Sequence, residues 1–219
     1  MRKVNNNILV PNIPCKICIR LYNFLQQQQL KNPDWYNAPI TSFLPVNQPY
    51  QSEILIVGLA PGLQGANRTG RPFTGDHAGI LLYNTLRKYG FAIGDYDPDA
   101  NDNLQLVNCI IANAVRCVPP QNKPTTDEIN NCRGFLASLI ENLPNLKVII
   151  PLGTIAHNSL LKILKLKIKD YPFKHGALGQ FENKYILSSY HCSRYNTQTN
   201  RLTTQMFEDI FSRAKSLIS

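Results

Sequence analysis

Residues 58–76 read Gly58-Leu-Ala-Pro-Gly-Leu-Gln-Gly-Ala-Asn-Arg-Thr-Gly-Arg-Pro-Phe-Thr-Gly-Asp76, and they follow the apolar run Ile54-Leu-Ile-Val57. The apolar run predicts a buried strand, and residues 78–88 after the stretch have the apolar spacing of a helix. Five glycines and two prolines among these nineteen residues indicate unusual backbone conformations and close approach to another group. The stretch lacks the Gly-Lys-Ser/Thr ending of a phosphate-binding P-loop. It therefore predicts a ligand-binding loop between a strand and a helix, with a plain surface loop as the alternative.

Strand-like and helix-like segments alternate along the rest of the chain. Apolar runs that predict strands lie at 53–58, 104–112, 147–152 and 184–189. Helices are predicted at 78–89, at 125–143, from just after Gly153 to about 166, and at 202–218. Thr125 and Glu128 have the spacing of a capping box at the start of the second of these helices. The alternation predicts one three-layer α/β/α domain over residues 1–219, with a central four-stranded parallel sheet.

Three segments with chemically useful side chains follow predicted strands: the 58–76 loop, Asn113 and His191. The carboxyl ends of parallel strands meet at one edge of a sheet, so the three segments are expected to share one cleft. The Asn113 amide offers a donor and an acceptor side by side, which suits the edge of a nucleobase. The alternative for Asn113 is a simple cap on the chain turn that follows the strand.

Two further features of this cleft admit both a functional and a structural interpretation. Phe73 either anchors the central loop in the core or offers its ring as a stacking platform for a planar ligand. A lone histidine at a strand end is more often structural. His191, however, precedes the polar run 193–201, which contains two arginines, several amides and hydroxyls, and no acid. Such a run can bond phosphates without repulsion.

The net charge of this 219-residue chain is +9, and it is unevenly distributed. Residues 160–219 contain ten Lys or Arg and four acids, which suits a polyanion such as nucleic acid or else a merely solubilising surface. Residues 95–102 hold four aspartates, so we expect this loop to face away from any phosphate backbone. The chain has no membrane-length apolar run and no apolar stretch of a secretory signal at its start. We therefore expect a soluble cytoplasmic protein.

The chain contains six cysteines: Cys15, Cys18, Cys109, Cys117, Cys132 and Cys192. Disulfide bonds are not expected among them in an intracellular protein. The first two form one C-x2-C pair, and fourteen residues separate Cys117 from Cys132. This spacing is compatible with a zinc ion, an iron–sulfur cluster or buried free thiols. Cys109 lies inside a predicted strand and is expected in the core. Cys192 adjoins His191, and a nucleophilic role for it is the less favoured interpretation.

The motifs together resemble the iron–sulfur uracil-DNA glycosylases, and within that superfamily they are most similar to family 5, also called type B. The resemblance is carried by Gly58-Leu-Ala-Pro-Gly62, Asn67-Arg-Thr-Gly-Arg-Pro-Phe-Thr-Gly-Asp76, Asn113-Ala-Val-Arg-Cys-Val-Pro-Pro120 and His191-Cys-Ser-Arg-Tyr-Asn-Thr-Gln-Thr199. It extends over residues 14–217, which is nearly the whole chain.

The resemblance implies a structural [4Fe–4S] cluster held by Cys15, Cys18, Cys117 and Cys132. It also implies that the protein hydrolyses the N-glycosidic bond of uracil in DNA and leaves an abasic site. Hypoxanthine and xanthine are expected as further substrates, and the protein is expected to act as a monomer. The target base must leave the duplex and enter the cleft.

The resemblance also suggests a role for each matching residue. Base binding is expected from Gly58, Leu59, Ala60, Phe73, Asn113 and His191. DNA contacts are expected from Asn67, Arg68, Ser193, Arg194, Asn196 and Arg201, and Tyr195 or Asn196 would fill the space that the base vacates. For catalysis, His191 would donate a hydrogen bond to the leaving base, and Asp76 would orient water or stabilise the cationic sugar. Asp76 also has the position of a helix cap, which is its structural alternative.

The chain departs from the family pattern at two places. Cys192 stands where the family has proline in a His-Pro-Ser motif, and no Asp, Glu or Asn lies between Gly58 and Gly65. These departures leave room for a non-catalytic iron–sulfur nucleic-acid-binding protein on the same scaffold. A zinc-stabilised nucleotide hydrolase is a second alternative, which predicts a colourless protein instead of a brown one.

Overall fold

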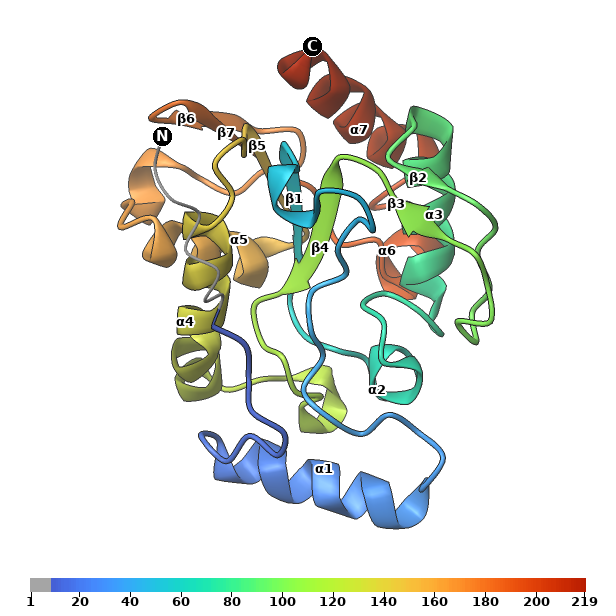
Figure 1. Cartoon of the computed structure of the whole chain (residues 1–219). Helices are drawn as coiled ribbons and strands as arrows, with labels where there is room; N and C mark the ends of the chain where they lie inside the picture. The colour runs from blue at the N-terminus through green and yellow to red at the C-terminus, as the bar shows by residue number, and fades with distance from the viewer. Residues whose placement is uncertain (1–8) are drawn as a thin grey trace.

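A computed structural model of the chain describes residues 9–219, and a five-stranded sheet lies at its centre (Figure 1). The strand order is β4 (Cys109–Asn113), β1 (Ile54–Gly58), β5 (Val148–Pro151), β7 (Lys184–Leu187) and β6 (Leu178–Phe181). The first four strands are parallel, as predicted, whereas β6 pairs antiparallel with β7. The predicted count of four strands was therefore one too few. No buried strand was expected at β6 because it combines exposed Leu178 and Gln180 with Gly179.

Helices cover both faces of this sheet and confirm the three-layer α/β/α class. Side chains of β1 alternate between two apolar cores, because successive residues of a strand point to opposite faces. Ile54 and Ile56 pack with α3 (His77–Tyr89) and α7 (Thr204–Ile218). Leu55 and Val57 pack on the other face with α4 (Thr126–Glu141) and α5 (Thr154–Ile163).

Helix α4 begins with the predicted capping box. The Glu128 backbone N–H donates to the Thr125 hydroxyl, and the Thr125 N–H donates to the Glu128 carboxylate at 2.8 Å. The strand predicted at 104–112 is divided in two, by contrast. Asn108 has a φ of 52°, which ends β3 (Gln105–Leu106) before β4 begins. Strand β3 instead pairs antiparallel with β2 (Ala92–Ile93) in a separate small ribbon.

The remaining helices and turns lie before or between these main elements along the chain. Helix α1 (Ile19–Lys31) forms the lower edge of the view in Figure 1, and α2 (Ala66–Thr69) lies within the central loop. Helix α6 (Arg194–Gln198) occupies the polar run after His191, where Ser193 caps it. Single 3-10 turns are η1 (Pro49–Gln51), η2 (Pro120–Asn122) and η3 (Ile168–Asp170).

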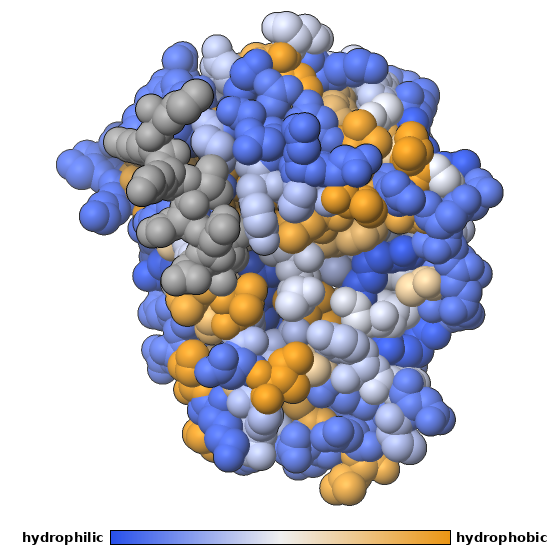
Figure 2. All heavy atoms as spheres, in the orientation of Figure 1, coloured by the Kyte–Doolittle hydropathy of each residue, from blue (hydrophilic) through white to orange (hydrophobic). Residues whose placement is uncertain are grey.

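Hydrophilic residues cover much of the face seen in Figure 2, with smaller apolar groups between them. Within residues 9–219, no helix combines the length and apolar character needed to cross a membrane. Residues 1–8, where a secretory signal was not expected, lie outside the described part of the chain.

Candidate active site

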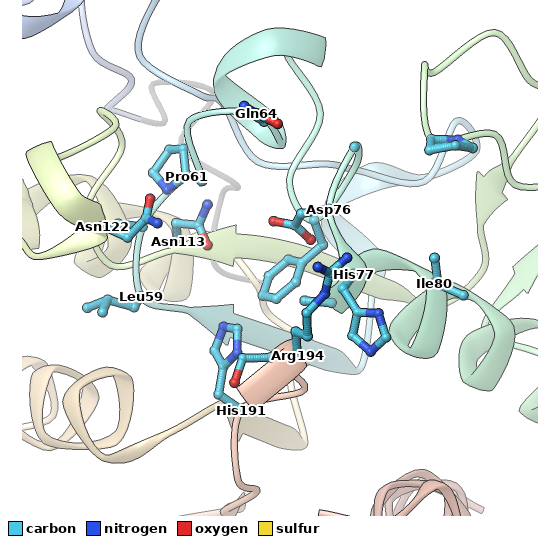
Figure 3. A pocket seen from close by; sticks show the side chains of 17 residues that line it. Leu59, Pro61, Gln64, Asp76, His77, Ile80, Asn113, Asn122, His191 and Arg194 are labelled. Carbon is cyan, nitrogen blue, oxygen red and sulfur yellow. The ribbon is translucent and has the colours of Figure 1, made fainter. Parts of the chain in front are cut away.

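A cavity of about 680 Å³ lies at the carboxyl ends of the strands. It is lined by the central loop, the end of β4, the η2 turn and the segment that begins at His191. Figure 3 shows Asn113, Asp76 and His191 around this common space, although each comes from a different part of the chain. The predicted convergence of the three segments on one cleft is therefore seen in the structure.

Phe73 forms one wall of the cavity, and its backbone is strained. Its φ is 54°, a left-handed conformation that bulky residues rarely adopt, so the surrounding packing must hold it there. Its ring lies against the His191 imidazole with centroids 5.7 Å apart and an angle of 27° between the planes. Gly79 allows this arrangement, because a Cβ there would lie 1.8 Å from the Phe73 carbonyl oxygen.

Asn113 is nearly fully buried at the end of β4, beside Gly58 of β1. Its side-chain oxygen has no hydrogen-bond partner in the structure. A buried amide oxygen without a partner is costly, so this atom is well suited to a ligand that brings a donor. Gly58 makes room for this group: a Cβ there would lie 2.4 Å from the Asn113 oxygen and 2.6 Å from the Phe73 ring.

Asp76 performs the structural role considered for it and also lines the cavity. One carboxylate oxygen accepts the Gly79 N–H at 3.2 Å and caps α3. The second oxygen lies against two glycines of the central loop, since a Cβ on Gly62 or Gly65 would lie 3.0 or 2.6 Å from it. The capping contact uses only one oxygen, so the second remains at the cavity for another partner.

Burial lowers the pKa of His191, and the negative charge of Asp76 opposes this shift. The lowered pKa favours a neutral imidazole at neutral pH, which still carries one N–H donor. The backbone of His191 is held by Asn196, whose side-chain amide donates to the His191 carbonyl at 2.8 Å. Asn196 is thus committed to shaping the loop, and this contact speaks against its predicted role in filling the space left by a base.

The cationic and aromatic residues after His191 differ in their availability to DNA. Arg194 is exposed and lines the cavity. Tyr195 is 70% exposed on the same short helix. The Arg201 guanidinium lies over the Tyr190 ring, 4.8 Å from its centroid. Thr197 links α6 to α3, because its hydroxyl lies 3.0 Å from the His77 ring nitrogen.

Two predicted DNA contacts in the central loop need correction. Asn67 is fully buried and donates to the Asn37 side chain at 2.8 Å, so it cannot reach a phosphate. Arg68 forms an ion pair with Asp99 and also donates to the Pro98 carbonyl at 3.2 Å. Arg68 was predicted to contact DNA, but its partner Asp99 lies 31 residues further along the chain.

The same contacts fix the position of the acidic loop, which was expected to face away from any phosphate backbone. Residues 95–102 lie against the central loop, and Pro98 lines the cavity. Arg71 holds the base of the acidic loop through two hydrogen bonds to Asp102, and it also donates to the Asp97 carbonyl. The tip, by contrast, is held by Arg68. Arg68 thus positions a wall of the cavity.

Asn122 is a cavity residue that was absent from the predicted set. It belongs to η2 and has a φ of 57°, directly after Gln121 with a φ of 56°. Asparagine tolerates this left-handed conformation better than most residues. The signal in the sequence was the Pro119-Pro120 turn followed by polar residues, which places a second amide near Asn113 (Figure 3).

The four cysteines named above as cluster ligands come together from three parts of the chain. Burial raises the pKa of Cys117, and the neighbouring Cys132, Cys15 and Cys18 raise it further. Three of the four also share one apolar cluster with side chains of α1 and α4. Cys109 and Cys192 are buried elsewhere, in the core formed with α3 and α7.

Four sulfur donors are the ligand chemistry that a [4Fe–4S] cluster takes. Within residues 9–219, no group of three or more His, Cys, Asp or Glu side chains is close enough to hold one metal ion. A four-iron cluster needs a wider arrangement, because each of its four thiolates binds a different iron. The four cysteines supply soft sulfur ligands, which suit iron, and three of them lie in an apolar surrounding.

Comparison with known proteins identifies relatives over most of the chain. Residues 44–215 match the Uracil DNA glycosylase superfamily. The Type-5 uracil-DNA glycosylase of Thermus thermophilus is 37% identical over 211 residues, which cover 93% of each chain. The Type-5 uracil-DNA glycosylase of Mycobacterium leprae is 34% identical over 214 residues, covering 93% of this chain and 91% of that protein. The Type-4 uracil-DNA glycosylase of Thermotoga maritima is 32% identical over 169 residues, covering 76% and 78%.

Proposed function

The chain belongs to the uracil-DNA glycosylase superfamily, and from this premise we propose that it is a type-5 enzyme that removes uracil from DNA. It hydrolyses the N-glycosidic bond and leaves an abasic site. The observation that carries the proposal is the single cavity that gathers Phe73, Asn113, Asp76 and His191. A stacking ring, a base-reading amide, a carboxylate and an imidazole are the groups that such a reaction needs.

The flipped base is held by stacking and by hydrogen bonds to its edge. The Phe73 ring is fixed by its strained backbone and offers a preformed platform; stacking contributes roughly 1–3 kcal/mol. The unpartnered Asn113 oxygen accepts an N–H from the base edge, and Leu59 and Ala60 also line the cavity. Because Gly58 has no side chain, Asn113 and Phe73 can lie close together at the base-binding site.

His191 and Asp76 act on opposite charges in the transition state. As the glycosidic bond breaks, the base leaves with negative charge and the sugar becomes positive. The neutral His191 imidazole donates a hydrogen bond to a base oxygen and stabilises the developing anion. The Asp76 oxygen that does not cap α3 orients the attacking water or stabilises the sugar cation.

The DNA strand is held beside the cavity by residues after His191. The Ser193 region and the arginines Arg194 and Arg201 contact phosphates. Tyr195 enters the space that the base leaves, since its ring is exposed whereas Asn196 is bonded to the His191 carbonyl.

Hypoxanthine and xanthine are proposed as further substrates. The cavity of about 680 Å³ has room for a purine. Between Gly58 and Gly65 there is no acidic or asparagine side chain to narrow recognition to one base edge. Recognition by stacking and backbone groups tolerates a change of base.

Cys15, Cys18, Cys117 and Cys132 would hold the [4Fe–4S] cluster. Such a cluster would supply a structural link between the segment before α1, the turn after β4 and helix α4. Its place in the chain supports this role, because Asn122 at the cavity lies between the ligands Cys117 and Cys132. A cytoplasmic location, a monomeric state and a single domain over residues 1–219 stay predictions.

The test uses duplexes that carry one uracil, hypoxanthine or xanthine, followed by alkaline cleavage of abasic sites. We expect cleavage with wild-type protein and a strongly reduced single-turnover rate with His191→Ala and Asp76→Asn, while DNA affinity is retained. DNA binding without abasic sites would favour the non-catalytic scaffold protein. A colourless protein that contains zinc would contradict the cluster assignment.

A further inference from the structure

Arg116 carries a buried positive charge that no carboxylate compensates within the described residues 9–219. Its side chain is only 4% exposed. One guanidinium nitrogen donates to the Ser42 hydroxyl at 3.0 Å, while the buried Nε has no partner. Arg71, which is also largely buried, forms a paired set of hydrogen bonds with Asp102 instead. Arg116 lacks such an anion.

A guanidinium in an apolar interior is strongly disfavoured unless a negative charge lies nearby. The position of Arg116 indicates where that charge is found. It directly precedes Cys117 in the chain, and Cys117 and Cys132 pack in one buried cluster. Thiols are neutral, but the same sulfurs are thiolates when they bind iron.

We propose that Arg116 is the internal counter-charge of the four-iron cluster. The inference rests on the proposed cofactor. Four thiolates outweigh the positive charge of an iron–sulfur core, so the ligated cluster is an anion inside the protein. The Arg116 guanidinium neutralises part of this charge at the side of Cys117 and Cys132. The negative charge of the cluster in turn compensates the Arg116 guanidinium, whose side chain otherwise bonds only the Ser42 hydroxyl.

This role predicts effects that depend on charge rather than on shape. Reduction adds an electron to an anion, so a neighbouring cation favours the reduced state. Removing the cation lowers the reduction potential. It also weakens retention of the cluster, because the anion then lies in an apolar surrounding without compensation. A lysine at position 116 keeps the charge and should preserve both properties.

The experiment compares wild type with Arg116→Met, Arg116→Gln and Arg116→Lys, all purified without oxygen. Iron and sulfide per chain, the rate of bleaching in air with a chelator, and the reduction potential by voltammetry are measured. Arg87→Met is the control, since Arg87 pairs with Asp95 on the surface. Arg116→Met and Arg116→Gln should shift the potential to more negative values and bleach several-fold faster. Arg116→Lys and the control should resemble wild type.

The outcomes separate this inference from the proposal on which it rests. If wild-type protein contains no iron and sulfide, the proposed cofactor is refuted, and the inference about Arg116 is refuted with it. A cluster-containing wild type whose neutral variants keep its potential and bleaching rate overturns the inference alone. If the cluster is lost in all three variants, Arg116→Lys included, Arg116 acts through its packing and not through its charge. This result also overturns the inference. If Arg116→Met does not fold, Arg116→Gln decides, because its amide can still bond Ser42. Folded neutral variants that lack the cluster, with a cluster in Arg116→Lys, support the counter-charge.

Discussion

Replacing Gly58 with alanine tests how the cavity is assembled. The new Cβ would lie 2.4 Å from the Asn113 oxygen and 2.6 Å from Phe73 Cζ, so both groups must move by roughly 1 Å to reach ordinary contact. Neither is free to move, since Asn113 ends strand β4 in register with Gly58 of β1, and Phe73 has a strained backbone. Overpacking of this kind costs roughly 1–3 kcal/mol of stability. A displacement of about 1 Å in a catalytic site costs about 100-fold in rate.

Single-turnover cleavage of a uracil duplex measures the rate, and chemical denaturation measures the stability. Gly134→Ala is the matched control, because its Cβ would lie 3.7 Å from a Leu9 methyl group, at ordinary contact distance, within helix α4. That control should keep the wild-type rate and gain up to about 1 kcal/mol from helix propensity. If folded Gly58→Ala cleaves uracil at the wild-type rate, the close approach of Phe73 and Asn113 is not required for catalysis.

Three further substitutions test the walls and supports of the site. Asp99→Asn removes the ion pair with Arg68 and should loosen the tip of the acidic loop at Pro98. Because exposed ion pairs contribute little energy, the ratio of kcat/KM for xanthine to kcat/KM for uracil should rise only about two- to fivefold. The control Asp95→Asn should leave this ratio unchanged. The arginine partner lowers the pKa of Asp102 to about 2, below its unfolded value near 4. The stabilisation that this ion pair gives the fold is therefore complete above about pH 4 and is lost as the pH falls toward about 2. In denaturation experiments, Asp102→Asn should lower the free energy of unfolding by about 2 kcal/mol at pH 7 and by much less near pH 2. Tyr195→Ala should slow cleavage of duplex uracil about tenfold with little change on single strands, because only the duplex needs its vacated space filled; equal slowing of both substrates would contradict that role.

The sequence predicted the framework and the cleft well because both depend on local patterns. Apolar runs located the parallel strands, and the ends of those strands located Phe73, Asn113 and His191 around one cavity. Strand β6 was missed because its exposed, glycine-containing sequence has no burial signal. It is a strand through its pairing with β7, which is a property of the fold rather than of the segment.

Charged residues were predicted less well, because the partner of a charge lies far away in the sequence. Arg68 and the acidic residues 95–102 were assigned opposite orientations, one toward DNA and the other away from it, yet they contact each other. Arg116, in contrast, belongs to a motif that contains a proposed cluster ligand, and it is buried without any carboxylate partner in the described chain. The number of arginines therefore overstates the charge available to DNA. Arg194 lines the cavity and has no such partner among the described ion pairs, so the duplex is expected to approach from its side.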